Sequence, residues 1–165
     1  MSSGDIENKI YRPTEDRLYN LYAQHRPLYM WMGLEYRIDH MHHVPYLGGI
    51  GEAGAPVYID KRVPLFHTVS GRACNIGKYI AVHERFEWWL IKNLKMSYEQ
   101  AHIWANTAES WAVEGDGFRY ANYNYVVEKH AKEIRDEPYK DLPPGLATYP
   151  YRDEPKILEA LRRAT

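Results

Sequence analysis

The 165-residue chain contains one cysteine, nearly balanced charges and no long apolar run. One cysteine excludes an internal disulfide and a multi-cysteine zinc site. Lys and Arg number 21 against 22 Asp and Glu, so the net charge of −1 gives no general attraction to nucleic acid or an anionic membrane. No stretch approaches the roughly 18 apolar residues of a membrane-spanning helix, and the first residues do not resemble a signal peptide. We therefore expect a cytoplasmic protein that binds neither nucleic acid nor membrane.

Phenylalanine is also scarce, with 3 residues, whereas the chain has 15 tyrosines and 5 tryptophans. Tyrosine and tryptophan rings bury large areas but keep a polar tip that requires a hydrogen-bond partner. Tyr120, Tyr123 and Tyr125 gather on one expected helix. We expect them to pack that helix and to leave an exposed edge suited to contact with a protein partner or a second copy of the chain.

The sequence pattern predicts a single α+β domain over residues 1–165, mainly helical, with two or three short strands packed on a bundle of about four to five helices. Residues 1–13 are expected to form a loose arm, followed by a helix over 14–24. Leu28, Met32, Tyr36 and Met41 suggest a second helical piece, whose ends the pattern does not fix. Strands are expected at 57–60 and 63–67, with a glycine loop at 48–56 and a turn region at 71–77.

Three longer helices are expected at about 77–94, 98–114 and 118–135, and a short one at 157–163. Ser97 and Gln100 match a capping box at the start of the second, and Gly115 and Gly117 end it. Residues 136–154 contain four prolines and are expected to form an extended wrap over the surface.

The helix expected at 77–94 places two polar side chains inside its apolar stripe. On a helical wheel, His83 and Glu87 lie among the aliphatic residues rather than beside them. Because they are four residues apart, both side chains can meet at one point above the helix. Burial of a carboxylate is costly unless it is paired or bound to a metal. Glu84 lies at the edge of the stripe, within reach of a water held by the other two.

The next helix repeats this feature. His102 and Glu109 flank a seam of alanines on one side of the helix. Their spacing of seven residues corresponds to about 10.5 Å of helical rise, which is long for two direct ligands of one ion. His102 is therefore the better ligand candidate, and Glu109 is either a distant ligand or an acceptor that orients an imidazole.

His83, Glu87 and His102 form the set of two histidines and one carboxylate that zinc hydrolases use, which leaves a fourth position for water. A bound metal lowers the pKa of that water, and a neighbouring glutamate, here Glu84, accepts its proton. We expect a divalent metal, zinc by default and iron or manganese as alternatives.

The segment from His83 to Glu87 resembles the HExxH helix of zincin-type metallopeptidases, with glutamate in place of the second histidine. Together with residues 57–64, Ser97–Tyr98 and Ala101–His102, it is similar to short uncharacterised proteins of bacteria and their phages over residues 57–114. The resemblance implies that His83, Glu87 and His102 are metal ligands, Glu84 is the base and the strand at 57–60 is an edge strand that binds an extended peptide. The implied function is hydrolysis of an amide bond in a peptide or protein.

The alternative is a protein without enzymatic activity, such as a phage accessory or virion component. In that case the two histidines and the glutamates form a hydrogen-bonded polar cluster between helices, and the tyrosine-rich faces make the contacts. Glu99 and His102 match half of a di-iron motif, but no second copy accompanies them.

Four other features of the sequence favour structural roles. The histidines at 40, 42 and 43 are expected in a polar loop, with lining of the same cleft as the alternative. Gly49, Gly51 and Gly54 match a dinucleotide fingerprint but lack the strand before it and the helix after it, so we expect a flexible loop suited to act as a lid. Cys74 and Asp60 are expected to be structural, the first as a buried filler and the second near Arg62.

Overall fold

The computed structural model describes residues 37–135 and 140–164. In chain order these residues form β1 (Ile38–Asp39), β2 (Gly48–Ile50), β3 (Val57–Ile59), β4 (Phe66–Val69), β5 (Arg72–Asn75), α2 (Ile76–Leu94), α3 (Tyr98–Gly115), α4 (Tyr120–Arg135), the 3₁₀ helix η1 (Tyr149–Tyr151) and α5 (Pro155–Ala164). The mainly helical α+β class is therefore confirmed. The arm expected at 1–13 and the helix expected at 14–24 lie outside the described residues.

Most of the second helical piece, up to Tyr36, also lies outside them, and Met41 is not helical. Residues 38–39 form β1, which pairs in parallel with β3. β2 pairs with the other side of β3 in antiparallel register, Gly49 opposite Tyr58. The expectation of a loop over 48–56 is thus wrong for its first three residues.

β3 confirms the strand expected at 57–60, but its expected place at a sheet edge is wrong. The strand order is β1-β3-β2, so β3 is the centre of the sheet. All three of its residues are buried, because both neighbouring strands and α2 cover it. β2, not β3, is the strand that reaches the site described below.

The second sheet is a hairpin of β4 and β5. The strand expected at 63–67 begins three residues later, and the turn expected at 71–77 is wrong apart from its first residue. The turn consists of Ser70 and Gly71, with φ of 50° and 78°. Positive φ at both residues is typical of the two-residue turns that match strand twist. Asn75 at the end of β5 then caps α2 by accepting a hydrogen bond from the Lys78 N–H.

The three longer helices and the short final helix are confirmed, with ends shifted by up to two residues. The Ser97 side chain accepts the Gln100 N–H at the start of α3, as the capping pattern predicts. Asp116 is the C-cap of α3. The next residue, Gly117, has a backbone φ of 84°, and the chain leaves the helix there. α4 follows after two residues.

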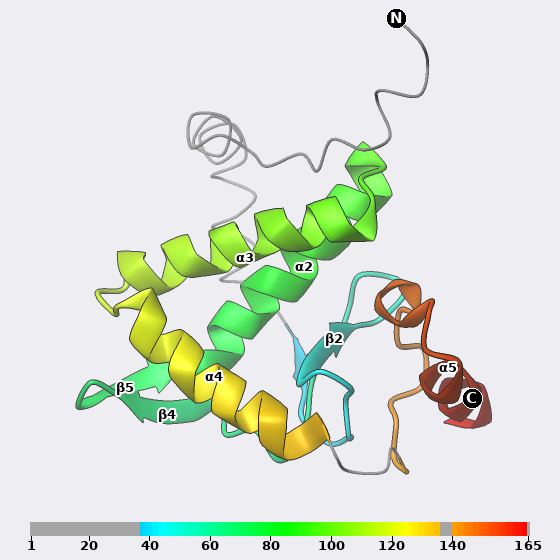
Figure 1. Ribbon diagram of the computed structural model, residues 1–165, viewed down its shortest axis with the longest axis horizontal. Coiled ribbons are helices and arrows are strands. Elements are labelled where there is room, and N and C mark those ends of the chain that lie inside the picture. Colours follow the sequence, from blue (N-terminus) through cyan, green and yellow to red (C-terminus); the bar gives the residue numbers. More distant parts are fainter. Residues whose placement is uncertain (1–36, 136–139, 165) are drawn as a thin grey trace, which may run out of the picture.

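Figure 1 shows α3 returning beside α2, α4 passing over the β4–β5 hairpin, and α5 at the opposite end of the molecule. The apolar seam between α2 and α3 is formed by Val82, Phe86, Leu90, Ala101, Trp104 and Ala108. A larger apolar cluster joins both sheets to α2 and α4. Among the described residues, no helix combines the length and the apolar character needed to cross a membrane.

The described part of the wrap, residues 140–154, contains no α-helix and only the short η1. It is held to the sheet edge: Leu146 bridges Gly51, and Ala147 N–H donates to the Ile50 carbonyl over 2.8 Å. Burial of Leu146 and Tyr151 against Val44 and Tyr58 fixes it further. This path brings η1 to the start of α3, beside the site.

Candidate metal centre

The two polar residues in the apolar stripe of α2 are buried, as their wheel positions predict. His83 is 8% exposed and Glu87 only 2%. Their closest atoms, His83 Nε2 and Glu87 Oε2, lie 3.4 Å apart. An uncompensated carboxylate at this depth would be strongly destabilising, so its partners define the site.

α3 supplies those partners from the facing helix. His102 Nδ1 lies 2.7 Å from Glu87 Oε2. The centroids of the His83 and His102 imidazole rings are 4.9 Å apart, in an edge-to-face arrangement. The alanine seam allows this approach, since Ala101, Ala105 and Ala108 bring no bulk to the interface.

His83, Glu87 and His102 form a compact donor set. Each offers one ligand atom, and these atoms lie within 4.8 Å of one another. Two imidazole nitrogens and one carboxylate oxygen are the donor types that zinc prefers, and a set of three leaves a position for water. The His102 side chain is 43% exposed, so solvent can reach the donor set. The donor set therefore fits a divalent metal in residue type and spacing.

Glu109 contacts His83 and does not join this set. Its Oε2 lies 2.9 Å from His83 Nδ1, and its Oε1 accepts the Tyr123 hydroxyl over 2.6 Å. This is the arrangement of an acceptor that orients an imidazole, one of the two roles predicted for Glu109. The bond directs His83 Nε2 toward Glu87 and His102.

The charges of the cluster shift its pKa values in opposite directions. Burial alone would lower the pKa of His83, but hydrogen bonds to Glu109 and Glu87 raise it well above the ordinary value. Burial would raise the pKa of Glu87, but His102 and His83 hold it below the ordinary value. Glu109, His83, Glu87 and His102 thus form a chain of alternating carboxylates and imidazoles.

Glu84 lies at the pocket wall, one position round the helix from His83. Its Oε1 faces β2, where a Cβ built on Gly48 would lie 3.3 Å away. Burial and the negative charge of Glu87 raise the pKa of Glu84 to about 8. A carboxyl with such a pKa can exchange a proton near neutral pH.

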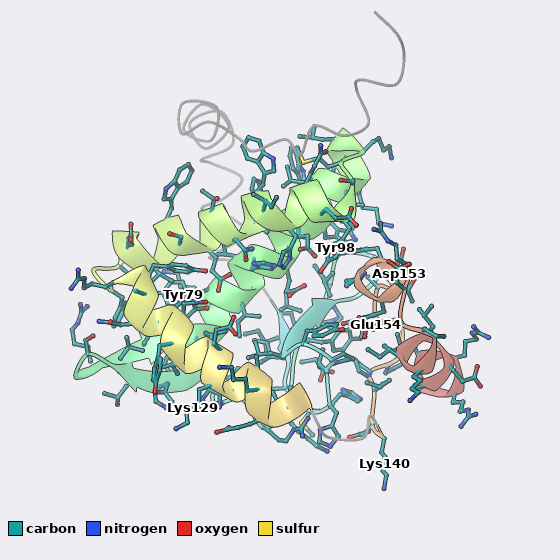
Figure 2. All side chains as sticks on the ribbon, in the orientation of Figure 1. Tyr79, Tyr98, Lys129, Lys140, Asp153 and Glu154 are labelled. Carbon is teal, nitrogen blue, oxygen red and sulfur yellow. The ribbon has the colours of Figure 1, made fainter. Side chains whose placement is uncertain are left out.

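A pocket of about 440 Å³ opens onto the cluster. α2, α3, α4, β2 and η1 all contribute to its wall, including Tyr46, Gly48, Tyr98, Tyr120 and Tyr151. In Figure 2, Tyr98 and Glu154 lie on the same side of the molecule, beside η1. Of the glycine segment only Gly48 reaches the pocket, and Trp88 and Lys92 hold the rest of the loop through Glu52.

The remaining candidates lie elsewhere. The histidines at 40, 42 and 43 contact the Val63 carbonyl, Asp39 and Asp60 respectively, and are not part of the pocket wall. Cys74 is fully buried. Asp60 is fully buried and pairs with Arg62 through both oxygens, as expected for a structural role.

Sequence reasoning missed Tyr123 as a partner of Glu109, because it was assigned to helix packing. It does pack, edge-to-face with Tyr79, and is fully buried. The available signal was its hydroxyl, since a buried tyrosine requires a partner for its polar tip. Tyr98, Tyr151 and Glu154 of the pocket wall were also missed.

Comparison with known proteins finds no matching family model, no matching curated protein and no matching solved structure. The resemblance to zincin-type metallopeptidases therefore depends on the motif residues alone.

Proposed function

We propose that the protein is a metal-dependent hydrolase that cleaves an amide bond in a peptide or protein. The observation that carries this proposal is the convergence of His83, Glu87 and His102 from two helices at the floor of an open pocket. These three residues would hold a divalent ion, with zinc favoured by the donor types. When bound, such an ion polarises a carbonyl and activates water.

The other residues of the centre support hydrolysis through proton transfer and orientation. Glu84, which lines the pocket beside His83, would accept a proton at its carboxylate and return it to the leaving amine. Glu109 fixes the His83 ring through Nδ1, and Tyr123 fixes Glu109 in turn. Gly48 allows Ile80 and Glu84 to approach β2 closely, because a Cβ there would lie 2.9 Å and 3.3 Å from their side chains.

The second candidate is a protein without enzymatic activity in which the cluster is architectural. The hydrogen bonds from His83 to Glu109 and from His102 to Glu87 favour this alternative, because the pairs are satisfied without an ion. Tyr125, which is 73% exposed, would then serve contact with a protein partner or a second copy.

Substitution of Glu84 separates the two functions. Zinc-loaded wild-type protein should cleave a mixed peptide library, whereas Glu84→Gln should retain the zinc and lose at least about 100-fold in kcat/KM, the lower range for loss of a general base. Glu114→Gln, on the exposed surface of α3, is the control and should keep full activity. Equal activity of Glu84→Gln and wild type would contradict the proposal, and so would the absence of cleavage by zinc-loaded wild type.

A further inference from the structure

The pocket above the candidate centre is lined by several glutamates and by no lysine or arginine among the described residues. Its wall contains five glutamates: Glu84, Glu87, Glu109, Glu128 and Glu154. The whole chain carries a net charge of only −1, so this excess is local. Two of the five, Glu128 on α4 and Glu154 before α5, lie outside the metal centre.

These two outer glutamates have no cationic partner in the described part of the chain. Glu154 accepts a hydrogen bond from the Tyr46 hydroxyl and makes no ion pair there, and Glu128 makes neither. Other acids form ion pairs, for example Asp116 with Lys78 and Asp141 with Lys61. Two carboxylates without an ion pair in the wall of one pocket leave a site for a cation.

Tyr151 of η1 provides an independent sign of a ligand. Its side chain is only 1% exposed and lines the pocket, yet its hydroxyl makes no hydrogen bond to a described residue. The neighbouring Tyr149 hydroxyl is buried near Glu87 and is not part of the pocket wall. Buried polar groups are nearly always paired, so the Tyr151 hydroxyl left open at the pocket indicates a ligand that pairs with it.

The aromatic wall favours the same ligand chemistry. Tyr46, which stacks on Tyr151 with ring centroids 5.9 Å apart, and Tyr98 present rings to the pocket. Ammonium and guanidinium groups bind carboxylates through charge-assisted hydrogen bonds and also bind the faces of aromatic rings. An acidic side chain would meet repulsion from every charged residue of the wall outside the histidines.

We propose that the pocket binds a lysine or arginine side chain of the peptide substrate, with Glu128 and Glu154 as its carboxylate partners and the Tyr151 hydroxyl as an acceptor. This inference rests on the proposed function, because it assigns the substrate class of the same site. The enzyme would then cleave peptides beside a basic residue and reject acidic ones.

Peptide binding tests the assignment apart from turnover. Three acetylated tripeptide amides, Ala-Lys-Ala, Ala-Gln-Ala and Ala-Glu-Ala, are titrated calorimetrically into EDTA-treated and into zinc-loaded full-length protein. The lysine peptide should bind about tenfold tighter than the glutamine peptide, as one charge-assisted hydrogen bond implies. The preference should fall with added salt, and the glutamate peptide should bind weakest. Equal binding of the lysine and glutamine peptides, or no binding of any, would overturn the inference.

Matched variants locate the cation. Glu128→Gln and Glu154→Gln should each reduce the lysine preference several-fold, and the double variant should abolish it. Glu133→Gln, five residues further along α4 and outside the pocket wall, should leave it unchanged. An equal loss of lysine preference in Glu133→Gln would contradict the assignment of the two glutamates. Binding of n-butylamine as tight as that of the lysine peptide would also contradict the proposal, because the site would then recognise the amine alone and not a peptide side chain.

Failure of this inference and failure of the proposed function give different results. A lysine preference in binding without zinc-dependent cleavage of any peptide would contradict the hydrolase function alone. Cleavage of all three peptides at the same kcat/KM would contradict the basic specificity alone.

Discussion

Tyr123 links the apolar core to the candidate centre, since its ring packs on Tyr79 and its hydroxyl donates to Glu109. Tyr123→Phe keeps the ring and removes that hydrogen bond, which leaves a buried carboxylate with one partner fewer. We expect the free energy of unfolding to fall by about 1–3 kcal/mol and zinc affinity to fall by about tenfold or more. Denaturant unfolding and competition with a chelating dye measure the two effects.

Tyr125→Phe is the control for that substitution. It lies two residues further along the same helix and is 73% exposed, so loss of its hydroxyl should change neither quantity. An unchanged zinc affinity in Tyr123→Phe would contradict the orienting role of Glu109.

Asp60 is the residue through which acid should destabilise the fold. Burial would raise the pKa of Asp60, but both hydrogen bonds to the Arg62 side chain and the N–H groups of Arg62 and Val44 hold it below the ordinary value. A folded-state pKa below the unfolded value means that the carboxylate stabilises the fold above pH of about 3.9 and loses that contribution as pH falls through the folded pKa.

Asp60→Asn should therefore lower the free energy of unfolding by about 1.5–3 kcal/mol at pH 7. The difference from wild type should shrink as pH falls below about 4, where the wild-type carboxyl takes up its proton. Urea unfolding at pH 3 to 7 measures it, and Asp141→Asn, whose pair with Lys61 is exposed, serves as the control. A difference that stays constant over this range would contradict the pairing.

At the level of residues, helical spacing was sufficient to place His83 and Glu87 on one face of α2, whereas their convergence with His102 depends on how α3 packs against α2. Glu109 was assigned to either of two roles, and geometry favours the acceptor role. Tyr123, Tyr151 and Glu154 could not be placed. Their positions depend on how α4 and the C-terminal segment dock, which no local spacing encodes.

The elements show where local patterns suffice and where they do not. α2 and α3 were predicted within two residues because caps and apolar periodicity mark them. β5 was missed because Arg72–Asn75 contains no β-branched residue and forms a strand only by pairing with β4. β2 was missed because two of its three residues are glycines, which are rare in strands.

The loop between β2 and β3 is anchored to α2 rather than free. Gly54 has φ of +88°, and a Cβ there would lie 2.8 Å from the Trp88 ring. Gly71, in the β4–β5 turn, has φ of +78° and open space around it. Both Ala variants incur backbone strain, but only Gly54→Ala adds a clash, which typically costs about 1–3 kcal/mol more.

Thermal unfolding of the two variants measures this difference. Gly54→Ala should melt several degrees below Gly71→Ala, by about 2–4 °C for each kcal/mol. Equal midpoints would indicate that the loop moves away from Trp88 without cost, and would restore the lid predicted from its glycine content.

In the described part of the molecule, apolar clusters surround the polar centre, which lies between α2 and α3. Because the proposed ligands come from both helices, a bound ion should stabilise the native state and not the unfolded chain. Zinc at 100 times its dissociation constant should add about 2.7 kcal/mol, or roughly 5–10 °C in Tm. His102→Ala should remove this zinc-dependent shift, whereas His67→Ala, on β4 and away from the pocket, should retain it.

The metal content of the untagged, full-length protein tests the central claim most directly. Elemental mass spectrometry should find about one equivalent of a divalent transition metal per chain in the wild type and in His67→Ala, and less than about a tenth of that in His102→Ala and Glu87→Ala. Protein that carries no metal after purification, and takes up none when dialysed against zinc, would contradict the assignment. His83, Glu87 and His102 would then be a polar cluster that stabilises the contact between two helices.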